Sequence, residues 1–220
     1  MTQRDLAATR TRLQEWFAHR STGHAVVSDL RAANKAAGWS SESLIFTAKV
    51  GGTTDEYVIR IPPEGGGIFP DYDLGTQTRT QGFLREHGIP TPSPIWYEPD
   101  PAWIGSKFLV MPRIIGHTPS DTSYMTRGWL HDAGPTVQRC AHDSFLETLA
   151  TLHRIPVDQV SWLRRPAGTG VIAELTWWQE YAQWGTGGHL PDVMSQAFDW
   201  LTRQMPPQPD KLSVCWNDAR

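Results

Sequence analysis

Two short runs of alternating residues, 44–50 and 57–61, constrain the fold more than any other feature of this chain. Apolar side chains recur at every second position in both runs, which flank the glycine-containing segment 51–55. A period of two places these side chains on one face of a strand, and a glycine-rich turn between two such runs is typical of a hairpin. The sequence therefore predicts an antiparallel pair with one buried face.

Arg60 interrupts the second run, Tyr57-Val58-Ile59-Arg60-Ile61. A cation on such a strand must face solvent or find a polar partner. Two interpretations stay open from the residues alone. Arg60 is a solvent-facing side chain on a half-exposed strand, or its guanidinium binds a phosphate through several hydrogen bonds.

A segment of small residues, Gly38-Trp39-Ser40-Ser41-Glu42-Ser43, precedes the first run. Such a segment is either a plain turn or a loop that brings backbone N–H groups and the hydroxyls of Ser40, Ser41 and Ser43 up to a phosphate.

Residues 108–111 form a continuous apolar run, which predicts a buried strand, and Pro112 follows it directly. Because proline has no N–H, we expect the hydrogen-bond ladder to end at Pro112. Backbone groups near Pro112 and Ile114 would then be free. This is either a simple exit from the strand or a hinge whose free carbonyl and N–H contact the edge of an adenine.

The pattern changes from β to α after Gly116, where we place a domain boundary. We expect an N-terminal helix in residues 1–25, a sheet-and-helix lobe in 26–115 and a mostly helical lobe in 116–220. The apolar periodicity and the positions of glycine and proline predict helices at 3–20, 71–86, 143–153, 171–184 and 192–205.

The last nine residues read Leu-Ser-Val-Cys-Trp-Asn-Asp-Ala-Arg. Their alternation predicts a short strand at 212–216 that leads to Asp218. In isolation, this is either a polar tail or a strand that places a carboxylate where it accepts a proton from a substrate hydroxyl.

Composition excludes several classes of function. The net charge is −3, no basic stripe indicates a nucleic-acid surface, and no apolar run reaches the length of a membrane helix. Two cysteines form neither a disulfide framework nor a metal cluster, so we expect a reducing, cytoplasmic setting. The 11 tryptophans fit core packing or an aromatic-lined pocket.

In this order the parts resemble the aminoglycoside phosphotransferase family, also called the phosphotransferase enzyme family, which has a protein-kinase-like fold. The resemblance runs from about Leu30 to Arg220. Five blocks carry it: the segment 38–43, the strand 57–63 with Arg60, the strand and hinge 108–116, the helix ending Leu149-Ala150-Thr151-Leu152-His153, and the final Trp216-Asn217-Asp218.

The resemblance implies an α+β fold with an antiparallel-sheet N-lobe and a mostly helical, incomplete C-lobe. It further implies ATP and Mg²⁺ as cofactors and a small-molecule hydroxyl as the acceptor, with no nucleic-acid or membrane partner. By the match, Asp218 is the catalytic base and Arg60 holds the α- and β-phosphates. Ser40, Ser41 and Ser43 cover the phosphates, and the backbone at Pro112 and Ile114 holds the adenine.

Three departures from the family pattern qualify that reading. Asn217 replaces the glycine before the catalytic Asp, and Gln77 stands where an acid normally pairs with the clamping cation. The family's Asn and Asp ligands for Mg²⁺ are expected beyond residue 220, so we expect a chain truncated within its catalytic loop and without useful turnover. The alternatives are a non-catalytic nucleotide-binding remnant or a tryptophan-lined small-ligand-binding protein.

This reading predicts how nucleotide binding responds to metal. The 220-residue chain should bind ATP weakly, with little difference between Mg²⁺ and EDTA, because the expected metal ligands are missing. Titration calorimetry under both conditions measures this. A strong Mg²⁺ dependence would contradict the expected loss of the metal ligands.

Overall fold

A computed structural model of the protein describes residues 4–21, 23–33, 40–119, 127–207 and 211–216. The chain divides into two compact units. The first comprises Met1–Glu86 and Pro90–Ile115, and the second comprises His87–Ile89 and Gly116–Arg220. Each unit has its own architecture and is described separately.

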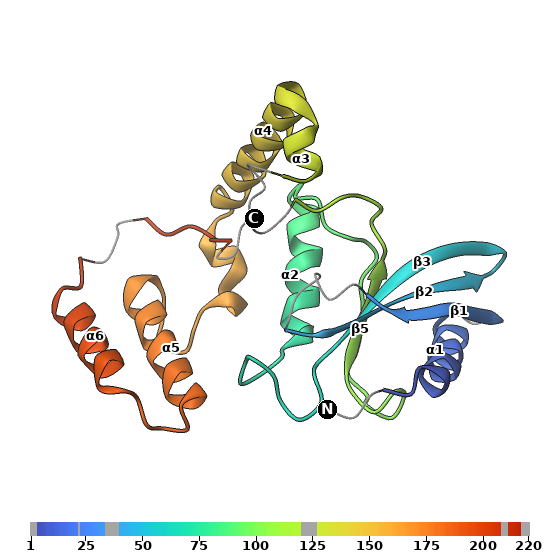
Figure 1. The fold of residues 1–220 in the computed structure, drawn as a ribbon, viewed down its shortest axis with the longest axis horizontal. Coiled ribbons are helices and arrows are strands. Elements are labelled where there is room, and N and C mark those ends of the chain that lie inside the picture. The colour runs from blue at the N-terminus through green and yellow to red at the C-terminus, as the bar shows by residue number, and fades with distance from the viewer. Residues whose placement is uncertain (1–3, 22, 34–39, 120–126, 208–210, 217–220) are drawn as a thin grey trace. The chain divides into compact units, whose positions relative to one another are not determined.

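The first unit is built on a five-stranded antiparallel sheet in the order β1-β2-β3-β5-β4 (Figure 1). Its strands are β1 (Ala25–Ala32), β2 (Glu42–Val50), β3 (Thr53–Ile61), β4 (Trp96–Glu98) and β5 (Phe108–Pro112). The predicted hairpin is β2–β3. Its turn consists of Gly51 and Gly52, which both have positive φ, a conformation that glycine adopts without steric cost.

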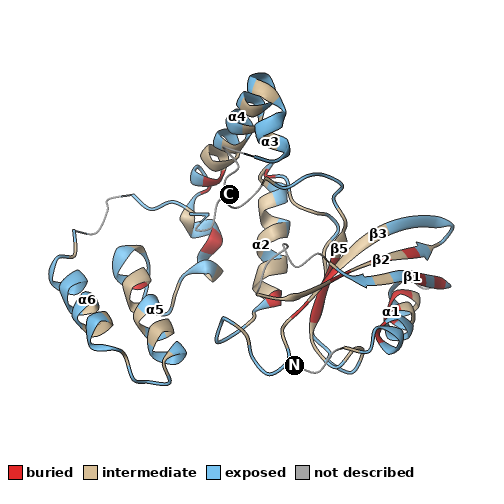
Figure 2. Cartoon of the chain, in the orientation of Figure 1, coloured by how far each residue is buried: buried red, intermediate tan, exposed pale blue. Residues whose placement is uncertain are grey.

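One face of this sheet forms the core of the first unit. Leu44 and Phe46 of β2 lie opposite Ile59 and Tyr57 of β3, and Leu44, Phe46 and Ile59 are at most 2% exposed. Helix α1 (Leu6–Ser21) covers this face with its buried residues Leu13, Trp16 and Phe17. Figure 2 shows the buried residues gathered between the sheet and this helix.

The second face is covered only in part. Helix α2 (Leu74–Glu86) packs against β4 and β5, where Leu109 is fully buried. The close approach favours a glycine, because a Cβ on Gly75 would lie 3.3 Å from the Tyr97 ring, which would have to shift by a few tenths of an ångström. Across β2 and β3 the same face stays half-buried, so part of the sheet surface remains accessible.

Helix α2 begins with an aspartate cap. The Thr76 N–H donates to Asp73 Oδ1 at 2.8 Å, which satisfies one of the backbone donors left free at a helix start. Hydrogen bonds from the Thr76 side chain and backbone lower the pKa of Asp73 below its ordinary value. The carboxylate form of Asp73 therefore stabilises the folded state.

The second unit is helical. It contains α3 (Trp129–Asp132), α4 (Gly134–His153), the 3₁₀ segment η2 (Val157–Leu163), α5 (Gly170–Gly185) and α6 (Asp192–Arg203). Its buried apolar residues among those described are Ile89, Leu152, Ile155, Val160 and Ala173. None of the described helices of the chain combines the length and the apolar character needed to cross a membrane.

Two sequence predictions for this unit need correction. Helix α4 begins at Gly134, nine residues before the predicted start at 143, because Pro135 occupies the first turn, where a missing N–H costs no hydrogen bond. Residues 211–216 form no strand. An extended segment becomes a strand only beside a partner, and the described part of this unit places none next to it.

The combination of an antiparallel sheet and a helical unit confirms the predicted α+β class. Four of the five predicted helices lie within three residues of their predicted bounds, and α4 is the exception. The order of the predicted hairpin and helices is therefore the one that the sequence indicated, and the strand expected at 212–216 is the exception.

Removal of the α2 cap should destabilise the first unit. Asp73→Ala should lower the free energy of unfolding by about 1 kcal/mol at pH 7. Because the folded pKa of Asp73 is depressed, this contribution is present above the unfolded pKa and is lost as the pH falls through the lower, folded value. Urea unfolding from pH 7 to pH 3 measures the difference between variant and wild type, and a difference that grows toward low pH would contradict the cap.

Candidate functional site

The second face of the β2–β3 hairpin carries Arg60. In the sheet register Arg60 lies opposite Ser43 of β2 and Leu109 of β5, on the face away from α1. Its Nη2 donates to Ser41 Oγ at 2.9 Å. The strand pairing thus brings three residues predicted from the sequence, Ser41, Ser43 and Arg60, to one place.

In the part of the chain that the structure describes, no acid balances the charge of Arg60. Among the described residues no carboxylate lies within 4.0 Å of its guanidinium, and burial lowers the pKa of Arg60. Gln77 lies on α2 and carries no charge, while Asp73 accepts hydrogen bonds from Thr76. A partly desolvated cation without a counter-charge favours binding of an anion.

The loop before β2 is described only from residue 40 onward. Ser40 and Ser41 are half-buried and lead into β2, and the backbone carbonyl of Ser43 accepts a hydrogen bond from Ala33 N–H at 2.9 Å. Gly38 and Trp39, which the sequence analysis included in this loop, lie outside the described residues.

Sequence reasoning missed an apolar surface beside Arg60. Ile45, Val58 and Met111 lie in register across β2, β3 and β5, on the same face as Arg60, and all three are half-buried. The signal was available in the alternation, because Val58 stands two positions before Arg60 and must share its face. Such a surface can accept the flat face of a planar ring.

The strand β5 corrects the expectation that Pro112 ends the ladder. The N–H of the next residue, Arg113, donates to Glu56 O of β3 at 2.9 Å. In an antiparallel pair hydrogen-bonded and non-hydrogen-bonded positions alternate, so Pro112, opposite Tyr57, stands where no N–H is required. The proline is therefore accommodated inside the ladder.

The chain becomes exposed immediately after Arg113. Ile114 and Ile115 are 68% and 75% exposed, although both are large and apolar. The backbone N–H of Ile114 has no hydrogen-bond partner within the part of the chain that the structure describes. The predicted hinge residue Ile114 thus has an accessible backbone at the edge of the apolar surface, and whether Ile114 and Pro112 contact a ligand stays a prediction.

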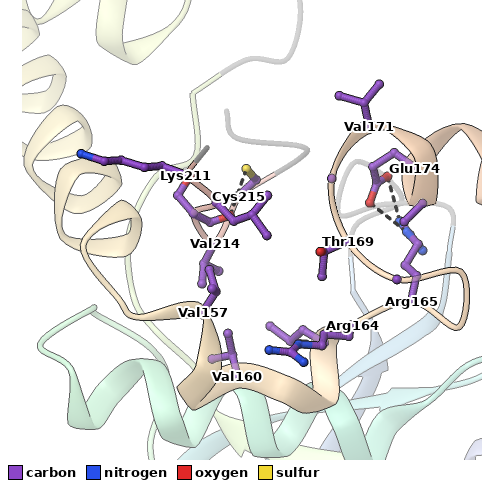
Figure 3. A pocket seen from close by; sticks show the side chains of 16 residues that line it. Val157, Val160, Arg164, Arg165, Thr169, Val171, Glu174, Lys211, Val214 and Cys215 are labelled. Carbon is purple, nitrogen blue, oxygen red and sulfur yellow. Dashed lines mark hydrogen bonds and ion pairs between the residues drawn. The ribbon is translucent and has the colours of Figure 1, made fainter. Parts of the chain in front are cut away.

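The predicted catalytic base cannot be located in the same way. Asp218 lies outside the described residues, and so does Asn217. The segment 211–216 before it is described, and Lys211–Cys215 forms one wall of a pocket of about 660 Å³ in the second unit (Figure 3).

This pocket combines apolar and cationic groups. Val157, Val160 and Val214 are among its apolar lining residues and Arg164 is a cationic one, while the side chain of Lys211 extends away from the pocket (Figure 3). Arg165 is neutralised by Glu174, whose two oxygens accept from its Nε at 2.8 Å and its Nη2 at 3.1 Å. An aromatic-lined pocket was one of two interpretations of the 11 tryptophans, and Trp177, Trp178 and Trp184 of α5 do not line this pocket.

A metal site is not evident among the described residues, where no three His, Cys, Asp or Glu side chains come together as ligands. The described groups therefore do not by themselves identify a Mg²⁺ site, and the candidate site consists of Arg60, the serines, the apolar surface and the hinge.

A five-stranded antiparallel sheet in one unit, followed along the chain by a helical unit, is consistent with the α+β fold of protein-kinase-like phosphotransferases. The comparison with family models agrees. The model of the phosphotransferase enzyme family matches residues 36–220, and the chain belongs to this family.

Curated relatives give a second comparison. The chain is 24% identical over 165 residues to acyl-CoA dehydrogenase family member 11 of Pongo abelii, 26% to that of Rattus norvegicus and 27% to that of Gallus gallus. In each case the match covers 74% of this chain and 20% of the relative. The chain therefore spans about a fifth of the length of the curated relatives it matches.

The position of Pro112 in the ladder can be tested by mutation. Pro112→Ala should change the free energy of unfolding by less than about 1 kcal/mol, because it breaks no hydrogen bond and alters mainly the freedom of the unfolded chain. Ile59→Ala, at a fully buried site of β3, is the control and should cost about 2–5 kcal/mol. Urea unfolding measures both. A Pro112→Ala effect as large as that of the control would contradict the assigned register.

Proposed function

We propose that the protein binds ATP and transfers its γ-phosphoryl group to the hydroxyl of a small molecule. The observation that carries this proposal is the partly buried guanidinium of Arg60. A serine hydroxyl lies beside it, and no carboxylate of the described residues pairs with it. Membership of the phosphotransferase enzyme family supports the reaction class.

The first unit offers a group for each part of the nucleotide. Arg60 would hold the α- and β-phosphates, and the loop containing Ser40, Ser41 and Ser43 would cover them. The adenine would lie on Ile45, Val58 and Met111, with its edge toward the backbone of Pro112 and Ile114. The half-buried apolar surface and the free Ile114 N–H support this arrangement.

The transfer itself requires an acceptor hydroxyl. Its oxygen forms a bond to the γ-phosphorus while the bond to the β–γ bridging oxygen breaks, and ADP leaves. We assign the proton of the hydroxyl to Asp218 on the strength of the sequence match. Mg²⁺, when bound, would neutralise charge on the β- and γ-phosphates.

The pocket of the second unit is our candidate for the acceptor site. The segment Lys211–Cys215 forms its wall, and in the sequence this segment leads within three residues to Asp218. An acceptor in this pocket would therefore approach the stretch of chain that carries the proposed base.

Both cysteines are free and exposed, Cys140 on α4 and Cys215 in the pocket wall. Thiols in such positions persist in a reducing compartment, which supports our proposal of a cytoplasmic setting.

Arg60→Ala should weaken ATP binding about 10- to 100-fold, because a hydrogen bond to a charged group contributes about 1.5–3 kcal/mol and each 1.4 kcal/mol is tenfold. Titration calorimetry measures the affinity. Arg12→Ala is the matched control, since it removes an exposed arginine of α1 whose ion-pair partner among the described residues is Glu15.

Two further outcomes decide between readings. If ATP neither binds nor raises the melting temperature of the wild-type chain, the proposed function is wrong. If ATP binds with equal affinity to wild type and Arg60→Ala, the phosphate assignment of Arg60 is wrong, although nucleotide binding stands.

A further inference from the structure

A cluster of three charged residues lies at the edge of the apolar surface, and neither the sequence analysis nor the proposed function uses it. Glu56 of β3 stands between Arg113, which follows β5, and Arg31 of β1. Arg113 Nη1 lies 2.9 and 2.8 Å from the two carboxylate oxygens of Glu56, and Arg31 Nη2 lies 3.3 Å from one of them.

Glu56 holds Arg113 at two points. Its backbone carbonyl accepts the Arg113 N–H at 2.9 Å, and its carboxylate accepts the side chain. Both side chains are about one-third exposed, so the ion pair is partly shielded from water. We call this doubly attached pair the Glu56–Arg113 clasp.

The clasp is placed directly before the hinge. Arg113 is the last residue that the β3–β5 pairing fixes, and Ile114 and Ile115 beyond it are largely exposed. Because a trans peptide fixes the spacing between consecutive residues, the position of Arg113 limits where the Ile114 N–H can lie.

An irregularity in the pairing of β1 with β2 brings Arg31 to this cluster. Between Ser28 and Arg31 the β1–β2 register shifts by one residue, so that Arg31 lies opposite Ile45. In the unshifted register Arg31 would oppose Leu44, on the core face. The irregularity includes Asp29, which has a positive φ of 54°. The shift thus moves a cation from the buried face to the face of the candidate site.

We propose that Glu56 is a positioning residue for adenine, which acts through Arg113 to hold the hinge where its backbone meets the edge of the base. The inference rests on the proposed function. Arg31 contacts the Glu56 carboxylate from the other side. It contributes less than Arg113 to holding that carboxylate, because its contact is longer and its side chain is 48% exposed.

The test separates the two ends of the nucleotide. Affinities of the 220-residue chain are measured for ATP and tripolyphosphate by calorimetry, and for adenosine by NMR line broadening. Glu56→Gln should weaken the binding of adenosine and of ATP by the same factor, fivefold or more. It should leave the affinity for tripolyphosphate unchanged. Arg60→Ala should show the opposite pattern, in which the affinity for tripolyphosphate falls and the affinity for adenosine is unchanged.

A double-mutant cycle tests the route through Arg113. Arg113→Met should reproduce the adenosine loss of Glu56→Gln, and the double variant should lose no more than either single variant. Asp55→Asn is the matched control, since it removes the neighbouring carboxylate of β3, which has no ion pair among the described residues. Arg31→Ala should change adenosine affinity less than twofold.

The outcomes that overturn the proposal are distinct from those that overturn the function. If wild type binds ATP and Arg60→Ala weakens it, but Glu56→Gln leaves adenosine affinity within twofold, the clasp has no role in adenine binding. Equal weakening of all three ligands by Glu56→Gln indicates a purely structural role and equally overturns the proposal. Absence of ATP and adenosine binding to wild type refutes both proposals.

Discussion

The pairing register of β2 and β3 is the constraint on which the first unit depends. Because side chains alternate along a strand, one register places Leu44, Phe46 and Ile59 together in the core and sends Ser43, Val58 and Arg60 to the other face. A shift by one residue would bury the guanidinium of Arg60 among aromatic rings. Core stability and the candidate site are therefore specified by the same set of hydrogen bonds, and the two-glycine turn contributes to both.

Two charged residues of β3, Arg60 and Glu56, differ in their ion pairing. Arg60 is left without a counter-ion among the described residues, while Glu56 is held between two arginines a few positions earlier on the same strand. An unpaired, partly desolvated cation is a cost to the folded chain that an anionic ligand offsets. The paired carboxylate of Glu56 does not favour a ligand in this way. Its contacts instead hold Arg113 in place. Two charged residues of the same strand thus have opposite surroundings among the described residues, since Glu56 is paired with arginines and Arg60 has no carboxylate partner.

The sequence allowed the local features to be predicted and left the long-range ones out of reach. The hairpin, the face of Arg60 and the extent of α1, α2, α5 and α6 follow from periodicity and from glycine and proline positions. The strand predicted at 212–216 was wrong because alternation reports a preference for extended backbone and cannot supply a partner strand. The Glu56–Arg113 pair joins residues 57 positions apart, which no local pattern predicts. The residues before Arg31 likewise do not indicate the register shift there. Of the candidate site, Ser41 and Arg60 are found in contact, Pro112 lies inside a ladder that was expected to end, and Asp218 stays a prediction outside the described residues.

The distribution of aromatic rings gives the two units different optical properties. Trp16 is 1% exposed and lies within 5.2 Å of Phe108, measured between ring centroids, in the core of the first unit. On α5 of the second unit, Trp178 and Trp184 are 52% and 46% exposed. Indole emission shifts to longer wavelength as water reaches the ring. Buried Trp16 of the sheet unit therefore contributes to the blue edge of the intrinsic fluorescence spectrum, and exposed Trp178 and Trp184 of α5 contribute to its red edge.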